Sequence, residues 1–385
     1  TAAVKVFSLL SKFHRRRGFP FMGFRCGIIG LPNVGKSTIF NALSAAGAEV
    51  ANYPFCTIDP NVGIVPVADP RLDKIAEILH PPKVTRTTLE FVDIAGLVKG
   101  ASRGEGLGNK FLGHIRDVDA VVHVVRCFDD PDVVSLDGTV DPRRDVEIVN
   151  TELLLADLQT VEDRIEKTEK LLKTGDKSIR RQLDFLQEVL GALGRGVPAR
   201  RLSFDGDNDE IRKGLRLLTD KPVLYVANVN ESVLKGPSHL VRDLEEAARA
   251  EGAGCIVLCG DIEADIAGLP EDERRYYLEE LGFRESGLEK LVRAGYEMLG
   301  LITFYTTVGP ELRAWTVPKD TAAPIAAGRI HTDMQKGFIR AEILRFDDFL
   351  ACGGAARAKE KGLLRSEGKD YLIADGDIVL FRFNV

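Results

Sequence analysis

Short apolar runs alternate with stretches of helical periodicity over much of this chain. The apolar runs carry few polar residues, which is typical of strands buried on both faces of a sheet. A helical pattern follows the first run at residues 37–46, and helical segments separate most of the others. We therefore expect an α/β unit whose parallel sheet is covered by helices on both faces. Its strands are expected at residues 24–29, 62–67, 87–94, 120–126, 222–228 and 255–259.

This alternation is interrupted between residues 141 and 220, where two long helical patterns follow one another. A turn-like Thr174-Gly175-Asp176 separates them, so we expect two antiparallel helices packed like a coiled coil. The first, about 25 residues long, would extend roughly 37 Å, too far for a helix that only covers the sheet. Residues 141–220 are therefore interpreted as an inserted helical hairpin. Its packing positions are Leu154, Leu158, Val161, Ile165 and Leu172 in the first arm and Ile179, Leu183, Leu186, Leu190 and Leu193 in the second.

The pattern changes again after residue 301. Strand-like segments at 302–307, 313–317, 337–342 and 371–385 are separated by prolines and glycines. We interpret this region as a separate small α+β domain. The chain then divides into 1–21, a unit formed by 22–140 and 221–301, the helical insertion at 141–220, and a C-terminal domain at 302–385.

Charge is unevenly distributed along the 385 residues. The formal net charge is −6. Residues 1–21 contain no acidic residue, and removing their five positive charges from the total leaves −11 for the rest of the chain. A body this acidic is not expected to bind nucleic acid in general, so any RNA contact requires a local basic patch. The basic residues of the first segment are Lys5, Lys12, Arg15, Arg16 and Arg17.

The basic residues 1–21 precede Met22, and we interpret them as an extension upstream of the folded chain. An organellar presequence, which has the same composition, is the alternative. No run of about 18 or more apolar residues occurs, so no membrane-spanning helix is expected. The six cysteines lack the spacing of a disulfide framework or of a thiolate zinc site. We therefore expect a cytoplasmic protein.

The strongest chemical signal is at residues 30–37, Gly-Leu-Pro-Asn-Val-Gly-Lys-Ser, which fit the phosphate-binding pattern G-x-x-x-x-G-K-[ST]. A strand precedes this loop and a helix follows it, which makes an ordinary glycine turn a poor alternative. Glycines let successive backbone N–H groups surround phosphate oxygens at the positive end of the following helix. We expect Lys36 to contact the β- and γ-phosphates during catalysis, and the Ser37 hydroxyl to bind Mg²⁺. The residues expected to hold the nucleotide are Asn33, Val34, Gly35, Lys36, Ser37 and Thr38.

Two further elements of a nucleotide switch are expected. Strand 87–94 leads into Asp93-Ile94-Ala95-Gly96, the D-x-x-G pattern in which the Asp holds Mg²⁺ through water and the Gly N–H senses the γ-phosphate. Asp93 is therefore a candidate metal ligand and Gly96 a candidate catalytic group. Thr57, within the turn-rich residues 52–61, is a candidate second metal ligand. A turn cap is the alternative for Asp93, and a plain surface loop is the alternative for Thr57.

The residue after this motif bears on the rate of hydrolysis. Many GTPases place a Gln there to orient the attacking water. This chain has Leu97, whose side chain neither donates nor accepts a hydrogen bond. Another group must therefore position the water, or hydrolysis is slow until a partner assists.

The strand at 222–228 ends in Asn228-Val229-Asn230-Glu231, where GTPases commonly have Asn-Lys-x-Asp. Val229 replaces the Lys that packs along the base, and Glu231 replaces the Asp that accepts from guanine. A carboxylate one methylene further out fits guanine poorly, while Asn228 has the groups to read the amine and N7 of adenine. We expect Asn228, Val229 and Glu231 to contact the base with weakened selectivity for guanine. A strand-end turn without a binding role is the alternative.

Together, these motifs resemble the Obg-like ATPase (YchF) family. The resemblance runs from Met22 to Val385 and includes the helical insertion and a C-terminal segment similar to TGS domains. It rests on the motifs at 30–38, 52–61, 93–101 and 228–231, with Pro54-Phe55-Cys56-Thr57 in the second, and on Arg313-Ala314-Trp315-Thr316 and Ile330-His331-Thr332-Asp333.

The resemblance implies a Ras-like P-loop nucleotide-binding domain, an inserted α-helical coiled-coil hairpin and a C-terminal β-grasp (TGS-like) α+β domain. It also implies hydrolysis of ATP, often in preference to GTP, and association with the ribosome. Asn33 matches an Asn that binds K⁺ in some related P-loop GTPases, so K⁺ stimulation is implied as well.

One position departs from the family. Many bacterial members have a His, proposed to act in hydrolysis, after the strand that ends at 126–128. Ser135 corresponds to it here. A serine is a poor general base without a partner, and we interpret His114 as a solvated helix residue. The catalytic group that orients the water is therefore unassigned.

Two rival functions stay open. One is a GTPase with degenerate base recognition. The other is a ribosome- or RNA-binding adaptor in which nucleotide is mainly a conformational ligand with very slow turnover, which Leu97 and Ser135 favour. The exposed hairpin has no extended apolar seam beyond its own, so we expect a monomer.

Overall fold

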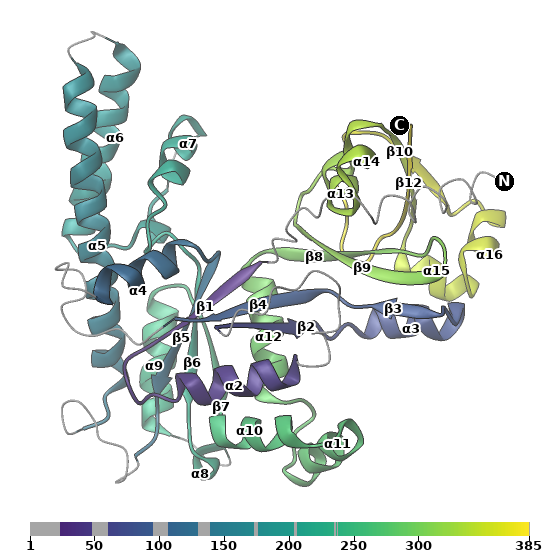
Figure 1. Ribbon diagram of the computed structural model, residues 1–385, viewed down its shortest axis with the longest axis horizontal. Helices are drawn as coiled ribbons and strands as arrows, with labels where there is room; N and C mark the ends of the chain where they lie inside the picture. Colours follow the sequence, from purple (N-terminus) through teal and green to yellow (C-terminus); the bar gives the residue numbers. More distant parts are fainter. Residues whose placement is uncertain are drawn as a thin grey trace.

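The computed structural model describes residues 24–47, 61–94, 107–129, 139–172, 176–203, 206–234, 236 and 238–384. Its centre is a six-stranded sheet in the order β2-β4-β1-β5-β6-β7 (Figure 1). Each strand expected from the apolar runs is confirmed to within one residue at either end. The strands are β1 (Arg25–Ile29), β2 (Val62–Pro66), β4 (Thr88–Asp93), β5 (Ala120–Arg126), β6 (Val223–Asn228) and β7 (Gly254–Leu258).

The sheet is parallel except at one edge. β4, β1, β5, β6 and β7 run in the same direction, as predicted. β2 pairs antiparallel with β4, with Val62 opposite Val92 and Pro66 opposite Thr88, so the prediction of a parallel sheet was wrong for this strand. β2 alternates buried and half-buried positions, and Pro66 lacks the N–H that a central strand needs; both are features of an edge strand.

Helices cover both faces of this sheet, as predicted. α2 and α12 lie on one face, whereas α5 and α9 lie on the other. The helix expected at 37–46 is α2, which begins one residue earlier. Among the helices in the described part of the chain, none combines the length and the hydropathy required to cross a bilayer. The helices around the sheet are α2 (Lys36–Ala46), α4 (Leu107–Arg116), α8 (Glu231–Leu234), α9 (His239–Ala250), α10 (Gly260–Gly268), α11 (Glu271–Glu280) and α12 (Gly287–Met298).

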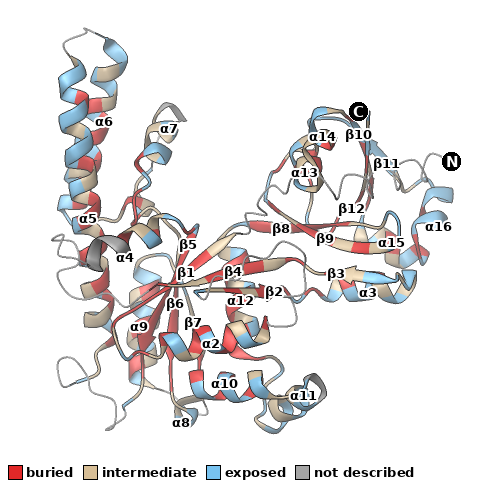
Figure 2. Ribbon diagram, viewed as in Figure 1, coloured by how far each residue is buried: buried red, intermediate tan, exposed pale blue. Residues whose placement is uncertain are grey.

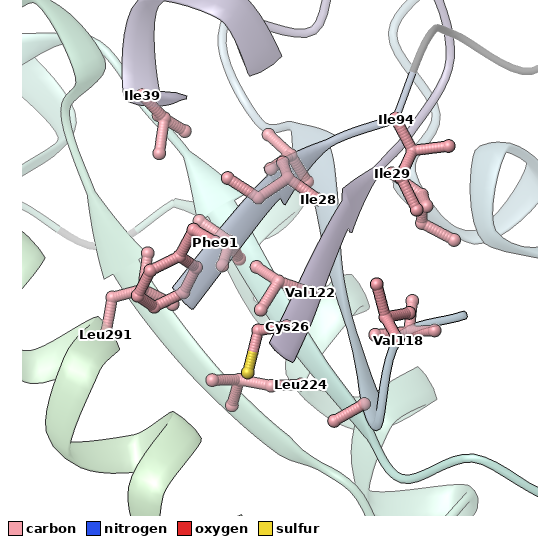
Figure 3. Close-up of a cluster of buried hydrophobic side chains, with 14 of the residues drawn as sticks. Cys26, Ile28, Ile29, Ile39, Phe91, Ile94, Val118, Val122, Leu224 and Leu291 are labelled. Carbon is pink, nitrogen blue, oxygen red and sulfur yellow. The ribbon is translucent and has the colours of Figure 1, made fainter. Parts of the chain in front are cut away.

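The core between the sheet and its helices is apolar and buried. Figure 3 shows Ile28, Val122 and Leu224, from three neighbouring strands, together with Ile39 of α2 and Leu291 of α12. None of these five side chains is more than 3% exposed. Close packing of this kind fixes the carboxyl ends of the strands, and with them the loop that follows β1.

A helical hairpin projects from the sheet (Figure 1). It consists of α5 (Pro142–Leu171) and α6 (Lys177–Gly194), which confirms the predicted insertion. The two arms pack through Val161, Leu186 and Leu193, and their outer sides are exposed (Figure 2). α5 has 30 residues rather than about 25, because it begins at the Asp141 cap and its first turns also pack on the sheet. A short helical stem follows, made of η4 (Ala199–Arg201) and α7 (Gly206–Leu215).

A buried carboxylate fastens the end of the insertion to its first helix. Asp157 of α5 is fully buried. It accepts hydrogen bonds from the N–H groups of Leu218 and Thr219 at 2.8 Å and from the Thr219 hydroxyl at 2.7 Å. The chain therefore enters β6 from a fixed point.

The C-terminal region forms a second six-stranded sheet, in the order β11-β10-β12-β8-β9-β3. β8 and β9 form a hairpin, and β12 lies between β8 and β10, parallel to the first and antiparallel to the second. This is the expected β-grasp arrangement. Its elements are β8 (Leu301–Thr306), β9 (Glu311–Pro318), α13 (Ala323–Ile330), α14 (Thr332–Lys336), β10 (Phe338–Leu344), α15 (Phe346–Cys352), α16 (Ala355–Glu360), β11 (Arg365–Glu367) and β12 (Ile378–Phe383).

The expected strand at 371–385 is shorter than predicted. β12 begins only at Ile378, because a turn precedes it. In this turn Asp377 accepts hydrogen bonds from the Tyr371 hydroxyl at 2.8 Å and from the Ala374 N–H at 2.9 Å.

A segment between β2 and β4 of the central sheet belongs to the C-terminal sheet, which the sequence pattern did not indicate. β3 (Lys83–Thr85) pairs parallel with β9, with Lys83 opposite Glu311. α3 (Pro70–Leu79) precedes it and packs into the same core as Phe349 of α15. The chain thus leaves the central sheet after β2, joins the C-terminal sheet and returns as β4 (Figure 1).

Candidate nucleotide-binding site

The loop between β1 and α2 has the backbone shape of a phosphate-binding loop. Gly30 has φ 153° and Gly35 has φ 90°, values that residues with a side chain rarely adopt. A Cβ atom at Gly30 would lie 2.4 Å from the carbonyl oxygen of Val124, and one at Gly35 would lie 2.1 Å from Nδ2 of Asn228. Both positions therefore require glycine for conformation and for space.

The N-terminus of α2 is open to an anion. Gly35 supplies no side-chain cap, and the first turn contains no acidic residue. The N–H groups of this turn and the positive end of the helix dipole are therefore available to a phosphate. Asn33 and Ser37 are exposed, Thr38 is half-buried, and Val34 is buried in the core, where it anchors the loop.

Lys36 lies inside the loop. Its Nζ donates a hydrogen bond to the carbonyl oxygen of Leu31 at 2.7 Å, and the residue is only 8% exposed. Burial lowers the pKa of Lys36, and the nearby Asp93 carboxylate partly offsets this change. A buried ammonium whose one hydrogen-bond partner among the described residues is a carbonyl oxygen is stabilised by an incoming negative charge, which a phosphate supplies.

Asp93 is placed beside this loop by the pairing of β4 with β1, where it lies opposite Ile28. Its Oδ1 atom is buried and has no hydrogen-bond partner among the described residues. Burial raises the pKa of Asp93, and the charge of Lys36 lowers it in part. A buried carboxylate oxygen without a partner costs free energy that a bound Mg²⁺ would offset. The donor set therefore fits Mg²⁺, with the exposed Ser37 hydroxyl as a second oxygen ligand.

Asn228 ties the loop to the neighbouring strands. Its Nδ2 donates to the carbonyl oxygen of Val34 at 2.9 Å, and its Oδ1 accepts from the Gly260 N–H at 3.0 Å. The residue is 5% exposed. Asn228 thus holds the phosphate loop in register with the turn after β7, a role that the sequence analysis did not include. One amide hydrogen and one lone pair are left for a base.

The rest of the base motif divides between core and surface. The Val229 side chain is 2% exposed and packs in the core with Cys127 and Leu240, so it does not reach the surface where a base would bind. Glu231 is exposed at the first position of α8. Asn230 stabilises this helix by accepting from the Val233 N–H at 3.3 Å. The structure therefore brings Asn228 to the loop and leaves Glu231 as the candidate base-contacting side chain.

The turn after β7 is a part of the site that the sequence analysis missed. Gly260 is buried at the start of α10, and a Cβ there would lie 3.3 Å from Oδ1 of Asn228 and 3.5 Å from the Thr38 side chain. Cys259-Gly260, small residues directly after an apolar strand, was the signal available in the sequence. Its position at the carboxyl edge of the sheet, beside the phosphate loop, follows only from the strand order.

Two of the histidines, His114 and His123, lie on α4 and β5. His114 is exposed on α4, as expected. His123 is 1% exposed on β5, opposite Ile29. Burial, followed by the positive charges of Lys36 and Arg200, lowers the pKa of His123 to about 3. It is therefore neutral at physiological pH and screened from solvent.

Several predicted positions lie outside the described residues. They are Thr57, Gly96, Leu97 and Ser135, together with the segment 1–21. Their assigned roles stay predictions.

The chain is similar to proteins of known family along most of its length. The YchF GTPase C-terminal family, described as a protein of unknown function, matches residues 301–384. The family described as 50S ribosome-binding GTPase matches residues 25–170. Both matches agree with the site geometry and with the second sheet.

Two curated relatives and one solved structure extend this likeness to nearly the whole chain. The ribosome-binding ATPase YchF of Pasteurella multocida (strain Pm70) is 52% identical over 364 residues, which span 94% of this chain and 100% of that protein. The protein of the same name from Bacillus subtilis (strain 168) is 52% identical over 366 residues, with the same coverage of each chain. The structure of the Schizosaccharomyces pombe YchF GTPase superimposes with a TM-score of 0.85 at 35% identity, covering 95% of this chain and 99% of that one. The chain therefore belongs to the YchF family.

Proposed function

We propose that this chain is a Mg²⁺-dependent nucleoside triphosphatase that cleaves the β–γ phosphoanhydride bond of ATP and also accepts GTP. The observation that carries the proposal is the convergence of three groups on one loop. Lys36 lies inside the loop, and Asn228 fixes the loop backbone from the neighbouring strand. Asp93, opposite Ile28, has a buried carboxylate oxygen with no hydrogen-bond partner among the described residues. This combination suits a triphosphate with its metal ion better than it suits an uncharged ligand.

In this proposal, different residues bind the phosphates and the metal ion. The N–H groups of residues 33–38 and the Lys36 ammonium bind the β- and γ-phosphates and offset the charge that spreads over them during transfer. Ser37, Thr57 and Asp93 would hold Mg²⁺, which would neutralise charge on the phosphate oxygens. Gly96 contacts the γ-phosphate through its N–H, as predicted from the D-x-x-G pattern. No group of this chain is assigned to orient the water.

Base recognition is relaxed for guanine in this proposal. Val229 is removed from the base by its burial, and Asn228 already uses one donor and one acceptor on the loop. Discrimination then depends on Glu231, whose longer side chain fits guanine poorly. Asn33, exposed with φ 62°, is proposed to admit K⁺ next to the phosphates.

We further propose that the protein acts on the ribosome as a cytoplasmic, monomeric switch. The support is its membership of a family whose curated relatives carry the name ribosome-binding ATPase. Co-sedimentation with ribosomes, with and without a non-hydrolysable ATP analogue, separates a switch from a passive adaptor. A switch binds in a nucleotide-dependent manner, whereas indifference to nucleotide indicates an adaptor.

The enzymatic proposal is tested by phosphate release from ATP and GTP at fixed Mg²⁺. We expect release from ATP that is lost on removal of Mg²⁺ and in Lys36→Ala. Lys170→Ala is the matched control, because Lys170 lies on the hairpin with a side chain that is 69% exposed. Equal turnover in Lys36→Ala and Lys170→Ala would contradict the proposal, since the ammonium inside the loop would then have no role.

A further inference from the structure

The excursion between β2 and β4 connects the nucleotide edge of the sheet to the C-terminal sheet. We call residues 67–87 the coupling arm; it contains α3 and β3. At the nucleotide end, the N–H of Asp93 donates to the carbonyl oxygen of Asn61 at 2.9 Å, which ties the end of β4 to the residue before β2. β2 therefore begins, and β4 ends, at the candidate metal ligand Asp93.

The far end of the arm is built into the core of the C-terminal sheet. Leu72 and Ile75 of α3 are fully buried and belong to one apolar cluster with Tyr305, Leu312 and Phe349. Leu and Ile side chains at such depth each contribute about 1.5–3 kcal/mol of burial free energy. α3 is thus a helix of the C-terminal unit by packing, although it lies between two strands of the central sheet by sequence.

A polar cluster fixes the beginning of α3 to the same unit. The Arg71 guanidinium donates to Asp69 at 3.0 and 3.1 Å and to Asp375 at 2.7 and 3.2 Å. The Tyr305 hydroxyl donates to Asp69 at 2.5 Å, and Asp375 accepts from the Thr303 N–H at 2.9 Å. One arginine thereby links the cap of α3 with β8 and with the turn before β12.

β3 fixes the other end of the arm. Its Thr85 lies opposite Arg313 of β9, and the Thr85 hydroxyl donates to Glu311 at 2.5 Å. Lys83 forms an ion pair with the same carboxylate at 3.1 Å. Backbone pairing and side chains therefore hold β3 as the edge strand of the C-terminal sheet.

The connections from the arm to the central sheet are short and closed by a hydrogen bond. The Val67 N–H donates to the carbonyl oxygen of Thr87 at 2.9 Å, which extends the β2–β4 ladder to the base of the arm. Val67 and Thr87 are each 8% exposed. The backbone pairing of β2 with β4 therefore continues up to the base of the arm.

We propose that the coupling arm makes the nucleotide site and the C-terminal sheet regulate each other. Mg²⁺-nucleotide at Asp93 shifts the ends of β2 and β4 and, through the arm, the β3–β9 edge of the C-terminal sheet. By thermodynamic reciprocity, a partner that binds the C-terminal sheet changes nucleotide affinity by the same factor. This proposal rests on the proposed nucleotide-binding function.

The chain contains its own reporter of this coupling. Trp315 is the single tryptophan of the sequence and lies on β9. Its Nε1 donates to the Thr306 hydroxyl at 2.9 Å, and the Arg313 guanidinium lies 4.2 Å from its ring centroid. Because Arg313 is paired with Thr85 of β3, a movement of the arm changes the surroundings of this ring.

The test is hydrogen exchange of the full-length chain with Mg²⁺ and a non-hydrolysable ATP analogue, read together with Trp315 emission. Exchange in peptides covering 30–46 reports nucleotide binding, and exchange in 311–318 reports the C-terminal sheet. We expect the analogue to slow exchange in both peptides and to change the emission of Trp315.

A decoupled variant identifies the route. Two glycines are inserted after Ala68 and two after Arg86, which lengthens both connections of the arm and leaves its packing surfaces intact. The control carries two glycines after Gly368, an exposed position between β11 and β12. We expect the decoupled variant to keep the response of 30–46 and to lose that of 311–318 and Trp315, while the control keeps both.

Three outcomes overturn the proposal, and they are distinguishable. Protection of 30–46 without any change in 311–318 shows that the two sites are independent. An undiminished response of 311–318 in the decoupled variant assigns the coupling to another route, such as the connection from α12 to β8, where the Tyr296 hydroxyl contacts Thr303 at 2.7 Å. No protection of 30–46 in the parent chain removes the nucleotide-binding function itself, and the coupling with it.

Discussion

Replacement of Asn228 by alanine tests whether the phosphate loop is held from the neighbouring strand. The substitution removes both of its hydrogen bonds at once, to the Val34 carbonyl oxygen at 2.9 Å and from the Gly260 N–H at 3.0 Å. Val34 and Gly260 are both buried, so neither backbone group gains a full hydration shell in exchange. The loop then loses its only described side-chain tie to β6.

The expected cost follows from these two unsatisfied groups. Each buried backbone group left without a partner costs about 1–3 kcal/mol, so the folded state loses about 2–6 kcal/mol. In a unit of about 150–250 residues, 1 kcal/mol corresponds to about 2–4 °C in the unfolding midpoint, which gives a decrease of at least about 4 °C. If about 1.4 kcal/mol of the loss appears as displacement of the loop, the Kd for nucleotide rises about tenfold.

Two assays measure this pair of effects. Scanning calorimetry of the nucleotide-free chain gives the unfolding midpoint, and titration with a non-hydrolysable ATP analogue in Mg²⁺ gives Kd. Asn150→Ala is the matched control, because Asn150 donates to Glu251 at 2.6 Å at the opposite edge of the sheet. This control is expected to lower the midpoint slightly and to leave Kd unchanged.

The reasoning is refuted if Asn228→Ala unfolds within about 2 °C of the parent and binds the analogue with the same Kd. Such a result would mean that water or another side chain replaces both bonds at no cost. A reduced midpoint with an unchanged Kd would restrict Asn228 to a structural role.

Three further substitutions test single groups. Lys36→Ala removes a charged donor worth about 1.5–3 kcal/mol, so titration should show at least about tenfold weaker triphosphate binding, and binding at the parental affinity would contradict this. For Asp93→Asn, the expected change in stability follows from the raised pKa of the buried Asp93 carboxyl. Protonation of this carboxyl stabilises the folded state; the effect is complete below the ordinary carboxyl pKa and is lost as pH rises through the raised pKa of the folded state. The neutral amide should therefore raise the unfolding midpoint of the nucleotide-free chain at pH 7 while it abolishes stimulation by Mg²⁺; a lower midpoint would show that the attraction to Lys36 outweighs burial. Glu231→Asp shortens the exposed carboxylate of the base motif, and competition titration should show the affinity ratio moving toward GTP; an unchanged ratio would remove Glu231 from base recognition.

The parts of the molecule that the sequence predicted are those with local signals. The strands of the central sheet are short, almost wholly apolar runs, and the glycine-lysine loop occupies the turn after the first of them. The hairpin α5–α6 could be predicted because apolar residues such as Leu158 and Leu186 recur at helical spacing over many turns. In each case the residues that determine the structure are close together in the chain.

The parts that were missed depend on contacts between distant segments. β3 has three residues, too few for any periodicity, and its partner β9 is more than 200 residues further along the chain. No local pattern assigns residues 70–85 to the C-terminal sheet. We therefore propose that the C-terminal domain consists of residues 70–85 together with residues 302–385. The two bonds of Asn228 likewise depend on strand order.

The burial of the Val229 side chain had a signal in the sequence. Tyr225, Ala227 and Val229 alternate along β6 and its extension, and all three are buried in the same cluster. The period of two places Val229 on the face of Tyr225 and Ala227, and Asn228 on the opposite face, where its side chain bonds the phosphate loop.

Parallel equilibrium titrations of the Mg²⁺-loaded chain with ATP and GTP test the central claim most directly, with Lys36→Ala titrated alongside. The account predicts saturable binding of one ATP, at least as tight as that of GTP, and a large loss of ATP affinity in the variant. Binding of GTP alone, or ATP affinity that is the same with and without the lysine, would contradict it.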